Sequence, residues 1–527
     1  MTGSDDDRVY RERWWTLACL CLSLVLIVAN VSSLNVNLPV LQKALNSSNS
    51  SLQWIVDAYG LVFAALLLPA GALADRYGRK SALQLGLVIM ASGSLVAMAA
   101  DANWQVIACR AVMGVGAAFV MPGTLSVLTN VFPAAERGKA IAIWAGFAGF
   151  GGVLGPLASG YLLDHFYWGS AFFINVPIAL LALVVGLWLV PNSKDPEDTV
   201  IDPIGVVLVV GGLFSLLYGV IDGPETGWLK LPILFAIALG VALLVGFVAW
   251  ELHTSDPMLD VRLFAIRAFA IGSGTIALQY FALFGLFFIF AQYLELAKGY
   301  APFKAAVVQV PIGLLSMVGA PLSARFVRRF GPRAVVGSGL MFTATGLAVL
   351  ATAHTTTPLA LIVPAEMLVG LGIGQTTAPS TTLIMTSVRN AKAGVGSAVN
   401  DVSREVGGAL GIAVLGSILN TAYRGAVGSR LPAGLPAAVA ADAHRSVTDA
   451  LLAVTNPRAH LSPAQAGAVI SAVKATFSSG FGAAMIGGTA MLVVCSVMVW
   501  VFQDRQDDRE EPPPPGGLDE AQPAPAP

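Results

Sequence analysis

Long apolar runs, separated by short polar segments, follow one another along most of the chain. Fourteen of them are uncharged or nearly so over at least about 19 residues, the length that an α-helix needs to cross a bilayer. An even number of crossings leaves both ends of the chain on one side of the membrane. We place the spans near residues 14–38, 52–74, 81–100, 104–131, 139–163, 169–190, 203–221, 231–250, 268–294, 305–324, 334–353, 358–386, 394–421 and 478–502.

The composition excludes a water-soluble protein. Of 527 residues, 56% are hydrophobic and 12% are charged, about half the roughly 25% that is usual in soluble domains. This number of charged residues is too small to cover the surface of a folded chain of this size. Lipid must therefore solvate most of that surface. Basic and acidic residues number 30 and 31, which gives no overall field to attract nucleic acid, and we expect no such partner.

The positions of the basic residues predict the orientation. With the N-terminus inside, 19 of the 30 Lys and Arg residues fall on cytoplasmic segments and four fall in short outer loops. This bias predicts that both termini are cytoplasmic. Arg8, Arg11 and Arg13 resemble the charged start of a signal peptide, but the following run is uncharged as far as Lys43. It is too long for a cleavable core, so we expect a retained span.

The chain also resembles itself. Residues 151–160 read GGVLGPLASG, and 256 residues later 407–416 read GGALGIAVLG. At the same offset Arg110 aligns with Glu366. At an offset of 253 the segment that ends at Lys80 aligns with residues 329–333. Glycine-rich helices can resemble each other by chance, but three matches in register are not chance. Eight spans separate the copies, so the halves share one orientation, as in rocking transporters.

We therefore predict an all-α membrane protein made of two pseudosymmetric six-helix bundles with two inserted helices. The outer segment 422–476 could form a short helical hairpin, and it is interpreted as an inert loop or, alternatively, as a lid. The acidic, proline-rich end is predicted to be disordered. The predicted parts are a cytoplasmic N-terminus (1–13), the N-terminal bundle (14–193), a linker with two inserted helices (194–267), the C-terminal bundle with its outer loop (268–502) and the tail (503–527).

Six charged residues fall inside predicted spans. Each costs roughly 2.5–3.5 kcal/mol at a helix centre, so it is a functional candidate by default. Burial favours the protonated form of a carboxylate, which a proton carrier needs near neutral pH. The candidates for proton coupling are Asp57, Arg110, Glu366, Asp401, Arg404 and Glu405.

Structural interpretations stand beside these functional ones. Asp57 could be a helix-start carboxylate, and Arg110 could belong to a purely structural pair. Glu366 occupies the repeat position of Arg110, so we expect the two to approach the centre from opposite halves.

Asp401, Arg404 and Glu405 share one helix face at i, i+3 and i+4. They would leave one negative charge for a proton or a cationic ligand, or else form a structural triad at the inner mouth.

Nothing in the sequence points to an enzyme. The four cysteines lie in apolar runs without metal-binding spacing, the five histidines are scattered, and no GxxxxGK[ST] loop is present. We expect no metal, no cofactor and no ATP hydrolysis. Two alternatives belong to other functional classes than transport: a sensor that does not transport, and a membrane enzyme. An enzyme would need a nucleophile–base set, which the sequence does not show, and a sensor would bind ligand without moving it.

Gly71-ALADRYGRK resembles the loop-2/3 signature of the major facilitator superfamily, GxLADRxGRK, at every specified position. Arg110-x3-Gly114-x-Gly116 resembles the fourth-helix motif of the family. The resemblance implies a major facilitator fold, with a gate and interdomain latch made by Gly71, Asp75, Arg76, Gly78, Arg79 and Lys80.

A second motif resembles the fifth-helix signature of antiporters. Ala142 and Ser159 stand where this signature has glycines, so the match is incomplete. The number of spans, with the segments that begin at Gln53 and Asn400, is similar to the 14-helix drug:proton antiporters. We expect the glycines to serve close helix packing. The matching residues are Gly151, Gly155, Pro156 and Gly160.

The first span departs from that subfamily. Its usual pattern, LDxTIVNVALP, contains a carboxylate, whereas this chain reads Ala29-NVSSLNVNLP with Asn30 at the acidic position. An amide cannot titrate, so either the coupling group lies elsewhere or the substrate differs from the usual lipophilic cations. Aromatic residues could stack on flat drugs or could face lipid. The candidates for the substrate cavity are Asn30, Trp54, Tyr59, Phe281, Phe284 and Phe288.

The resemblance implies a proton-coupled exporter of hydrophobic, often cationic drugs, working by alternating access in a bacterial cytoplasmic membrane. Its partners would be a small-molecule substrate, protons and the lipid bilayer, and we expect a monomer. The alternative is an exporter of an endogenous lipid or metabolite on the same scaffold. Asn30 favours this alternative, because a missing acid fits neutral or anionic cargo.

Overall fold

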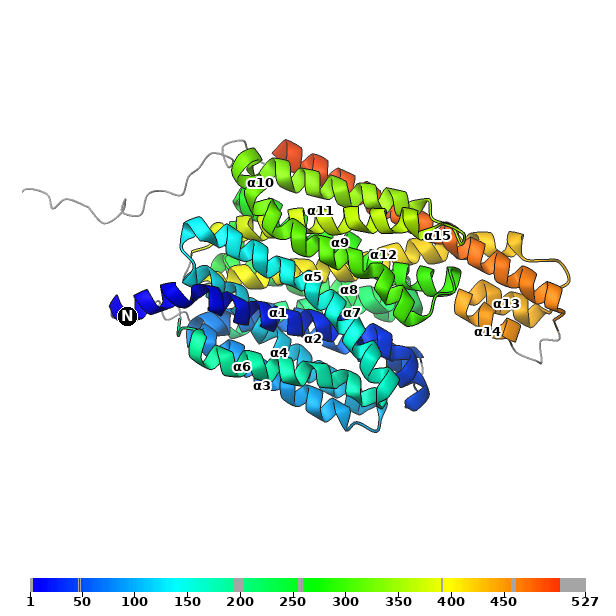
Figure 1. Cartoon of the computed structure of the whole chain (residues 1–527), viewed down its shortest axis with the longest axis horizontal. Coiled ribbons are helices and arrows are strands. Elements are labelled where there is room, and N and C mark those ends of the chain that lie inside the picture. Colours follow the sequence, from blue (N-terminus) through cyan, green and yellow to red (C-terminus); the bar gives the residue numbers. More distant parts are fainter. Residues whose placement is uncertain are drawn as a thin grey trace, which may run out of the picture.

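The computed structural model describes residues 3–45, 47, 49–193, 202–254, 257, 259–389, 392–455 and 461–502, and every regular element in these ranges is helical (Figure 1). The predicted tail, 503–527, and residues 194–201 of the predicted linker lie outside the described residues. The first half contains α1 (Gly3–Ala44), α2 (Asn49–Tyr77), α3 (Arg79–Met98), α4 (Asn103–Val131), α5 (Ala134–His165), η1 (Trp168–Ile174) and α6 (Asn175–Leu189). The inserted pair is α7 (Pro203–Thr226) and α8 (Leu231–His253). The second half contains η2 (Val261–Ala265), α9 (Arg267–Gln292), η3 (Tyr293–Ala297), α10 (Pro302–Ala351), α11 (Leu359–Thr386), α12 (Ala393–Arg430), α13 (Ala437–Arg445), α14 (Val447–Thr455) and α15 (Pro463–Phe502).

The described helices confirm the predicted number of crossings. Thirteen of them are long and apolar enough to span a membrane. One of these, α10, has 50 residues and is divided by Gly331, whose backbone is not helical (φ 80°, ψ 158°), so it accounts for two spans. The start of α1 and the end of α15 lie at the same end of the bundle (Figure 1), as an even number of crossings requires.

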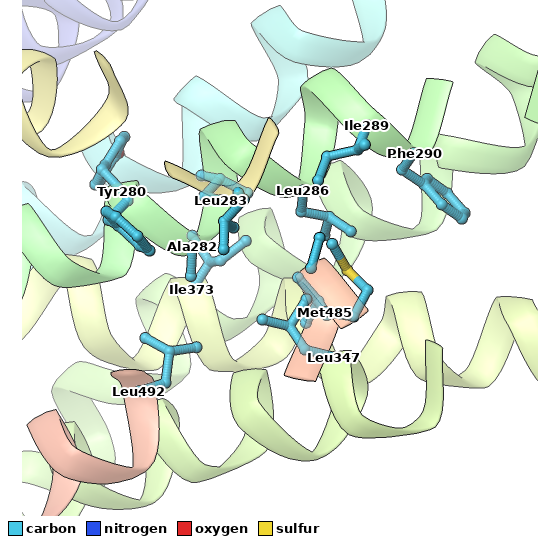
Figure 2. Close-up of a cluster of buried hydrophobic side chains, with 14 of the residues drawn as sticks. Tyr280, Ala282, Leu283, Leu286, Ile289, Phe290, Leu347, Ile373, Met485 and Leu492 are labelled. Carbon is cyan, nitrogen blue, oxygen red and sulfur yellow. The ribbon is translucent and has the colours of Figure 1, made fainter. Parts of the chain in front are cut away.

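Two large hydrophobic clusters lie in the two halves. One gathers buried residues mainly from α1–α6, and the other gathers them mainly from α9–α15. Figure 2 shows part of the second cluster, to which Leu286 of α9, Leu347 of α10 and Met485 of α15 belong. Because lipid tails are as apolar as leucine, such clusters are stabilised by close packing rather than by exclusion of water.

Glycine contacts show the internal repeat in three dimensions. A Cβ atom added to Gly155 of α5 would lie 2.6 Å from the carbonyl oxygen of Ala29 on α1. Its repeat counterpart, Gly411 of α12, packs just as closely on the carbonyl of Phe281 in α9. Thus α5 packs on α1 as α12 packs on α9, which is the helix-packing role that we expected for these glycines.

In each half the chain turns sharply after the second span, and these two turns, called corners below, are also equivalent. Gly78 and Gly331 both have positive φ, 116° and 80°, a conformation that glycine adopts without steric cost. Beyond each corner a basic side chain reaches the last helix of its own half. Lys80 donates to the carbonyl of Leu187 at 2.7 Å, and Arg333 donates to the carbonyl of Trp500.

The outer segment 422–476 is more helical than a loop. Helix α12 continues to Arg430, α15 begins at Pro463, and α13 and α14 lie beyond the end of the bundle (Figure 1). The Tyr423 hydroxyl donates to the carbonyl of Ala443 at 2.8 Å, which holds α13 on α12. The helical interpretation of this segment therefore describes it better than a loop, and its role as a lid stays a prediction.

Candidate functional site

Arg404 of α12 lies where helices of both halves meet. Its guanidinium carbon is 5.2 Å from the ring centre of Trp144 on α5 and 5.1 Å from that of Tyr280 on α9. The side chain is buried, and the negative faces of aromatic rings stabilise a buried cation. Arg404 also pairs with Asp401, with 3.7 Å between Nη1 and Oδ1. Any movement of α5 relative to α12 would therefore change the surroundings of this charge.

Two carboxylates accompany Arg404 on the same face of α12. Asp401 is 1% exposed, and its Oδ1 accepts a hydrogen bond from Asn400 at 3.1 Å. Its Oδ2 has no hydrogen-bond partner within the described part of the chain. Glu405 is close enough for the charges of Asp401 and Arg404 to act on it. The three predicted residues thus interact, and two carboxylates against one arginine leave one negative charge in excess.

Arg110 of α4 is held on the other side of this cluster. Its Nε donates to the carbonyl of Ile55 at 3.0 Å, and its guanidinium carbon lies 4.4 Å from the ring centre of Tyr59 on α2. The charge of Glu405 also reaches Tyr59. Tyr59 therefore lies between the arginine of the first half and a carboxylate of the second.

Asn30, at the position where the subfamily has an acid, belongs to a neutral hydrogen-bonded group. It is 2% exposed, and its Oδ1 accepts a hydrogen bond from Asn175 at 2.9 Å. Asn175 also donates to Ser94 at 3.2 Å. Asn30 lies beside the Tyr59 hydroxyl as well. The contacts that the described residues make around Asn30 are therefore with uncharged side chains: Asn175, Ser94 and Tyr59.

Glu366 lies apart from the other candidates. It is fully buried, and neither of its carboxylate oxygens has a hydrogen-bond partner among the described residues. Arg110 interacts with Ile55, Tyr59 and Asp57, and the expected approach of Arg110 and Glu366 to the centre stays a prediction. Each lies within its own half, at equivalent places of the repeat.

Asp57 faces an inserted helix. It is half-buried, its charge acts on Arg110, and it lines a small pocket between α2 and α7. In the same pocket Trp54 stacks on Tyr218, with ring centres 5.9 Å apart and an interplanar angle of 27°. Asp57 therefore lies at the edge of the central cluster rather than inside it.

The three phenylalanines predicted for the substrate cavity do not join Trp54 and Tyr59. Phe281 is buried in the hydrophobic cluster of the second half. Phe284 packs edge-on against Tyr280, with ring centres 5.5 Å apart, and Phe288 is 48% exposed. Of the six predicted cavity residues, Asn30 and Tyr59 thus lie together, Trp54 lies in the pocket between α2 and α7, and the three phenylalanines lie along α9.

The gate motif connects α2 to the start of α12. The Asp75 carboxylate accepts hydrogen bonds from the backbone N–H groups of Gly394, at 2.8 and 3.1 Å, and Val395, at 3.3 Å, and from Arg79 Nε at 2.8 Å. Unpaired N–H groups and the helix dipole favour a carboxylate at this position. A Cβ on Gly71 would lie 2.6 Å from the Gly394 carbonyl oxygen, so glycine permits this close approach. The contact closes the interface of the halves at one end.

The remaining motif residues lie outside this contact. Arg76 lies over the exposed ring of Tyr77, 5.3 Å from its centre. In the antiporter motif, Pro156 lies inside α5, and a Cβ on Gly160 would face Phe303 of α10 at 3.8 Å. Helix α5 therefore packs on α1 with one face and on α10 with another.

Sequence reasoning missed Trp144, Tyr280 and Asn175. Asn175 is a lone amide in an apolar run, so a scan for buried polar groups as well as charges would have found it. The two aromatic residues carry no such signal, because similar residues occur in most spans. Only the fold brings them to Arg404.

Comparisons with known proteins agree with this architecture. The family model described as Major Facilitator Superfamily matches residues 20–412. The chain is 34% identical to the multidrug efflux pump LfrA of Mycolicibacterium smegmatis, covering 94% of this chain and 97% of the relative. It is 31% identical to the methyl viologen resistance protein SmvA of Salmonella typhimurium, covering 93% and 98%. The structure of the proton:xylose symporter XylE aligns with a TM-score of 0.60 at 14% identity, covering 93% and 96%, which indicates a shared fold.

Proposed function

The chain belongs to the major facilitator superfamily, and from this premise we propose that it exports hydrophobic, often cationic drugs in exchange for protons. Membership makes it a multi-pass membrane transporter and not an enzyme. Relatives named as a multidrug efflux pump and a methyl viologen resistance protein support the choice of substrate class. We further propose a monomer in a bacterial cytoplasmic membrane, with both termini cytoplasmic.

The Asp401–Arg404–Glu405 cluster is the observation that carries the proposal. It lies at the interface of the halves, with Asp401 and Arg404 buried and Glu405 half-buried, and it has one more carboxylate than arginine. A buried excess charge is costly, so the cluster binds a proton or a cation to neutralise it. If the two compete for the same negative charge, binding of one releases the other, which is the requirement for exchange.

Alternating access would come from rocking of the halves. The Asp75 contact with the start of α12 holds one end closed, and the neighbours of Arg404 on α5 and α9 hold the centre. Substrate entering from the cytoplasm would displace protons, and protonation from the outside would expel it after the halves rock. Tyr59 connects this movement to Arg110.

Glu366 is proposed as a second proton carrier. A charged carboxylate without hydrogen bonds costs several kcal/mol in a dry interior, so Glu366 is neutral in the conformation described here. A change of packing around α11 would give it water and let it release a proton.

Export of an endogenous lipid or metabolite is the second candidate function. The neutral Asn30–Asn175 pair favours it, because amides bind uncharged cargo as readily as cations. This candidate uses the same coupling cluster and differs only in the substrate.

A panel efflux assay in a pump-deficient bacterial strain tests the proposal. Cells that express the chain should extrude ethidium and related cations, and a protonophore should abolish the extrusion. Extrusion that survives the protonophore would contradict proton coupling. Failure to extrude any cation, with extrusion of neutral compounds, would favour the second candidate.

A further inference from the structure

The inserted helix α7 lies across the seam between the two halves. A small hydrophobic cluster joins Leu61 of α2 and Leu217 of α7 to Ala409 of α12. Just beyond α7, the Trp228 indole donates to the Ser417 hydroxyl of α12 at 3.2 Å. Helix α7 thus contacts both halves at the end of the bundle opposite the Asp75 contact, so it is more than a linker.

Between α2 and α7 each helix contributes one aromatic ring and one carboxylate to the same small pocket. Trp54 and Asp57 are three residues apart on α2, and Tyr218 and Asp222 are four residues apart on α7. These spacings place each ring and acid on one helix face. The pocket lining contains no lysine or arginine, and Arg110, which lies close enough to interact with Asp57, is not part of it.

We propose that this pocket is a second binding site, for a planar aromatic or quaternary ammonium cation. Ring faces attract a cation through their negative quadrupole, most strongly where water is excluded, and the two carboxylates add the charge that selects against neutral ligands. The inserted helices would then take part in substrate binding. They would form a second site at the end of the bundle, away from the Asp401–Arg404–Glu405 cluster.

The two rings now fill the place that the cation would take. Trp54 and Tyr218 stack on each other 5.9 Å apart, so a flat cation binds by replacing one ring against the other. Trp54 is 37% exposed, so the pocket can be reached from outside the bundle. Asp222 is held by the Thr226 hydroxyl at 2.7 Å, which keeps its carboxylate at the pocket.

The inference extends the proposed function but does not require proton coupling. Binding at this pocket needs no gradient and uses none of the residues around Arg404. A chain that fails to exchange protons would therefore still bind a cation here, so the two proposals fail in distinguishable ways.

Cysteine protection tests the site in the full chain, reconstituted in lipid nanodiscs with ethidium as the probe. The four native cysteines are buried, so the wild-type chain supplies the background. Ile221→Cys places a thiol in the pocket lining, and Leu229→Cys, in the exposed loop that follows α7, is the matched control. Ethidium should slow maleimide labelling at position 221 by at least about threefold and leave labelling at position 229 unchanged.

Three further variants, each made in the Ile221→Cys chain, test whether the protection depends on Asp222 and on the ring of Tyr218. Asp222→Asn and Tyr218→Leu should abolish the protection, whereas Tyr218→Phe, which keeps the ring, should retain it. Equal labelling with and without ethidium would overturn the proposal, as would protection that survives both Asp222→Asn and Tyr218→Leu. Equal protection by the neutral dye Nile red would show an apolar crevice and would also overturn it.

Discussion

Arg404 has neighbours from both halves of the molecule and cannot lose its charge. Its guanidinium group lies near Trp144 and Tyr280 and pairs with Asp401. Because arginine remains protonated at all physiological pH values, protonation changes at this cluster must occur on Asp401 or Glu405. The role that we assign to Arg404 is to keep one of these carboxylates ready to release its proton.

Glu405→Gln and Asp401→Asn should each abolish proton-driven efflux. Each change keeps the shape of the side chain and removes its titration, so we expect the initial rate of ethidium efflux to fall at least about tenfold. Vesicles with an imposed pH gradient provide the measurement. Asp442→Asn on α13, whose carboxylate pairs with Arg445 at the surface, is the control. Undiminished transport in both variants would remove the coupling role from this cluster.

Glu366→Gln should change the number of protons transported per substrate and leave the stability of the fold unchanged. No described residue forms a hydrogen bond with the glutamate side chain, so glutamine removes no observed ion pair, and the melting temperature should stay within about 2 °C of the wild type. If Glu366 carries a proton, the same variant transports fewer protons per substrate. Unchanged proton stoichiometry would assign Glu366 a packing role only.

The charged candidates could be read from the sequence, but their partners could not. A charge inside an apolar run stands out because lipid excludes it. Arg404 contacts Trp144 and Tyr280 only because the fold brings together helices that are far apart in the chain. The same is true of the contact between Asn30 and Asn175. The same limit applies to Phe288, whose exposed position depends on helix rotation that the apolar pattern does not encode.

At the scale of elements, close helix contacts depend on particular glycines. Gly155 and Gly152 lie one turn apart on α5, yet only Gly155 contacts α1. A Cβ on Gly155 would lie 2.6 Å from the Ala29 carbonyl oxygen, and one on Gly152 would meet nothing within 4 Å. The repeat predicted that these glycines serve packing, but only the structure shows which of them do.

Gly155→Ala should destabilise the protein and Gly152→Ala should not. Overpacking typically costs about 1–3 kcal/mol, so the melting temperature of Gly155→Ala in detergent should fall by at least about 2 °C. Gly152→Ala should match or exceed the wild type, because alanine favours a helix by about 1 kcal/mol. Equal melting temperatures in the two variants would contradict the packing of α5 on α1.

Asp75→Asn should slow the transport cycle more than it weakens substrate binding. The asparagine can accept one of the bonds from the start of α12 but loses the charge that the helix dipole favours. We expect a lower kcat with a KM within about twofold of the wild type. Asp101→Asn, in the exposed corner before α4, is the matched control. A raised KM with unchanged kcat would place Asp75 in substrate binding instead of in the gate.

At the scale of the whole molecule, the two halves are alike in scaffold and different in chemistry. The repeat preserves the glycine contacts and the corners at Gly78 and Gly331. It replaces Arg110 by Glu366 and leaves Arg329-Phe-Gly-Pro-Arg without the acid that Asp75 supplies in the first half. In the proposed mechanism the shared scaffold lets the halves rock about their interface, and the residues that differ supply the coupling charges and the gate.

The number of spans and the repeat were predictable because bilayer thickness and duplication leave long, regular patterns, whereas the gate role of the motif around Asp75 stays a prediction. The helical outer segment was less predictable. Residues 422–476 lack a continuous apolar run, and their helices are stabilised by local contacts such as the bond between Tyr423 and Ala443. Their role, like the domain boundaries, stays a prediction.

Exchange of substrate for protons can be measured directly as coupled movement of the two across a membrane. The purified chain would be reconstituted in liposomes that contain a pH-sensitive dye, with no membrane potential, and ethidium would be supplied on one side. The account predicts that ethidium flowing down its gradient drives protons the opposite way, and that Glu405→Gln abolishes this proton movement. Ethidium transport without any proton movement in the wild-type chain would contradict it.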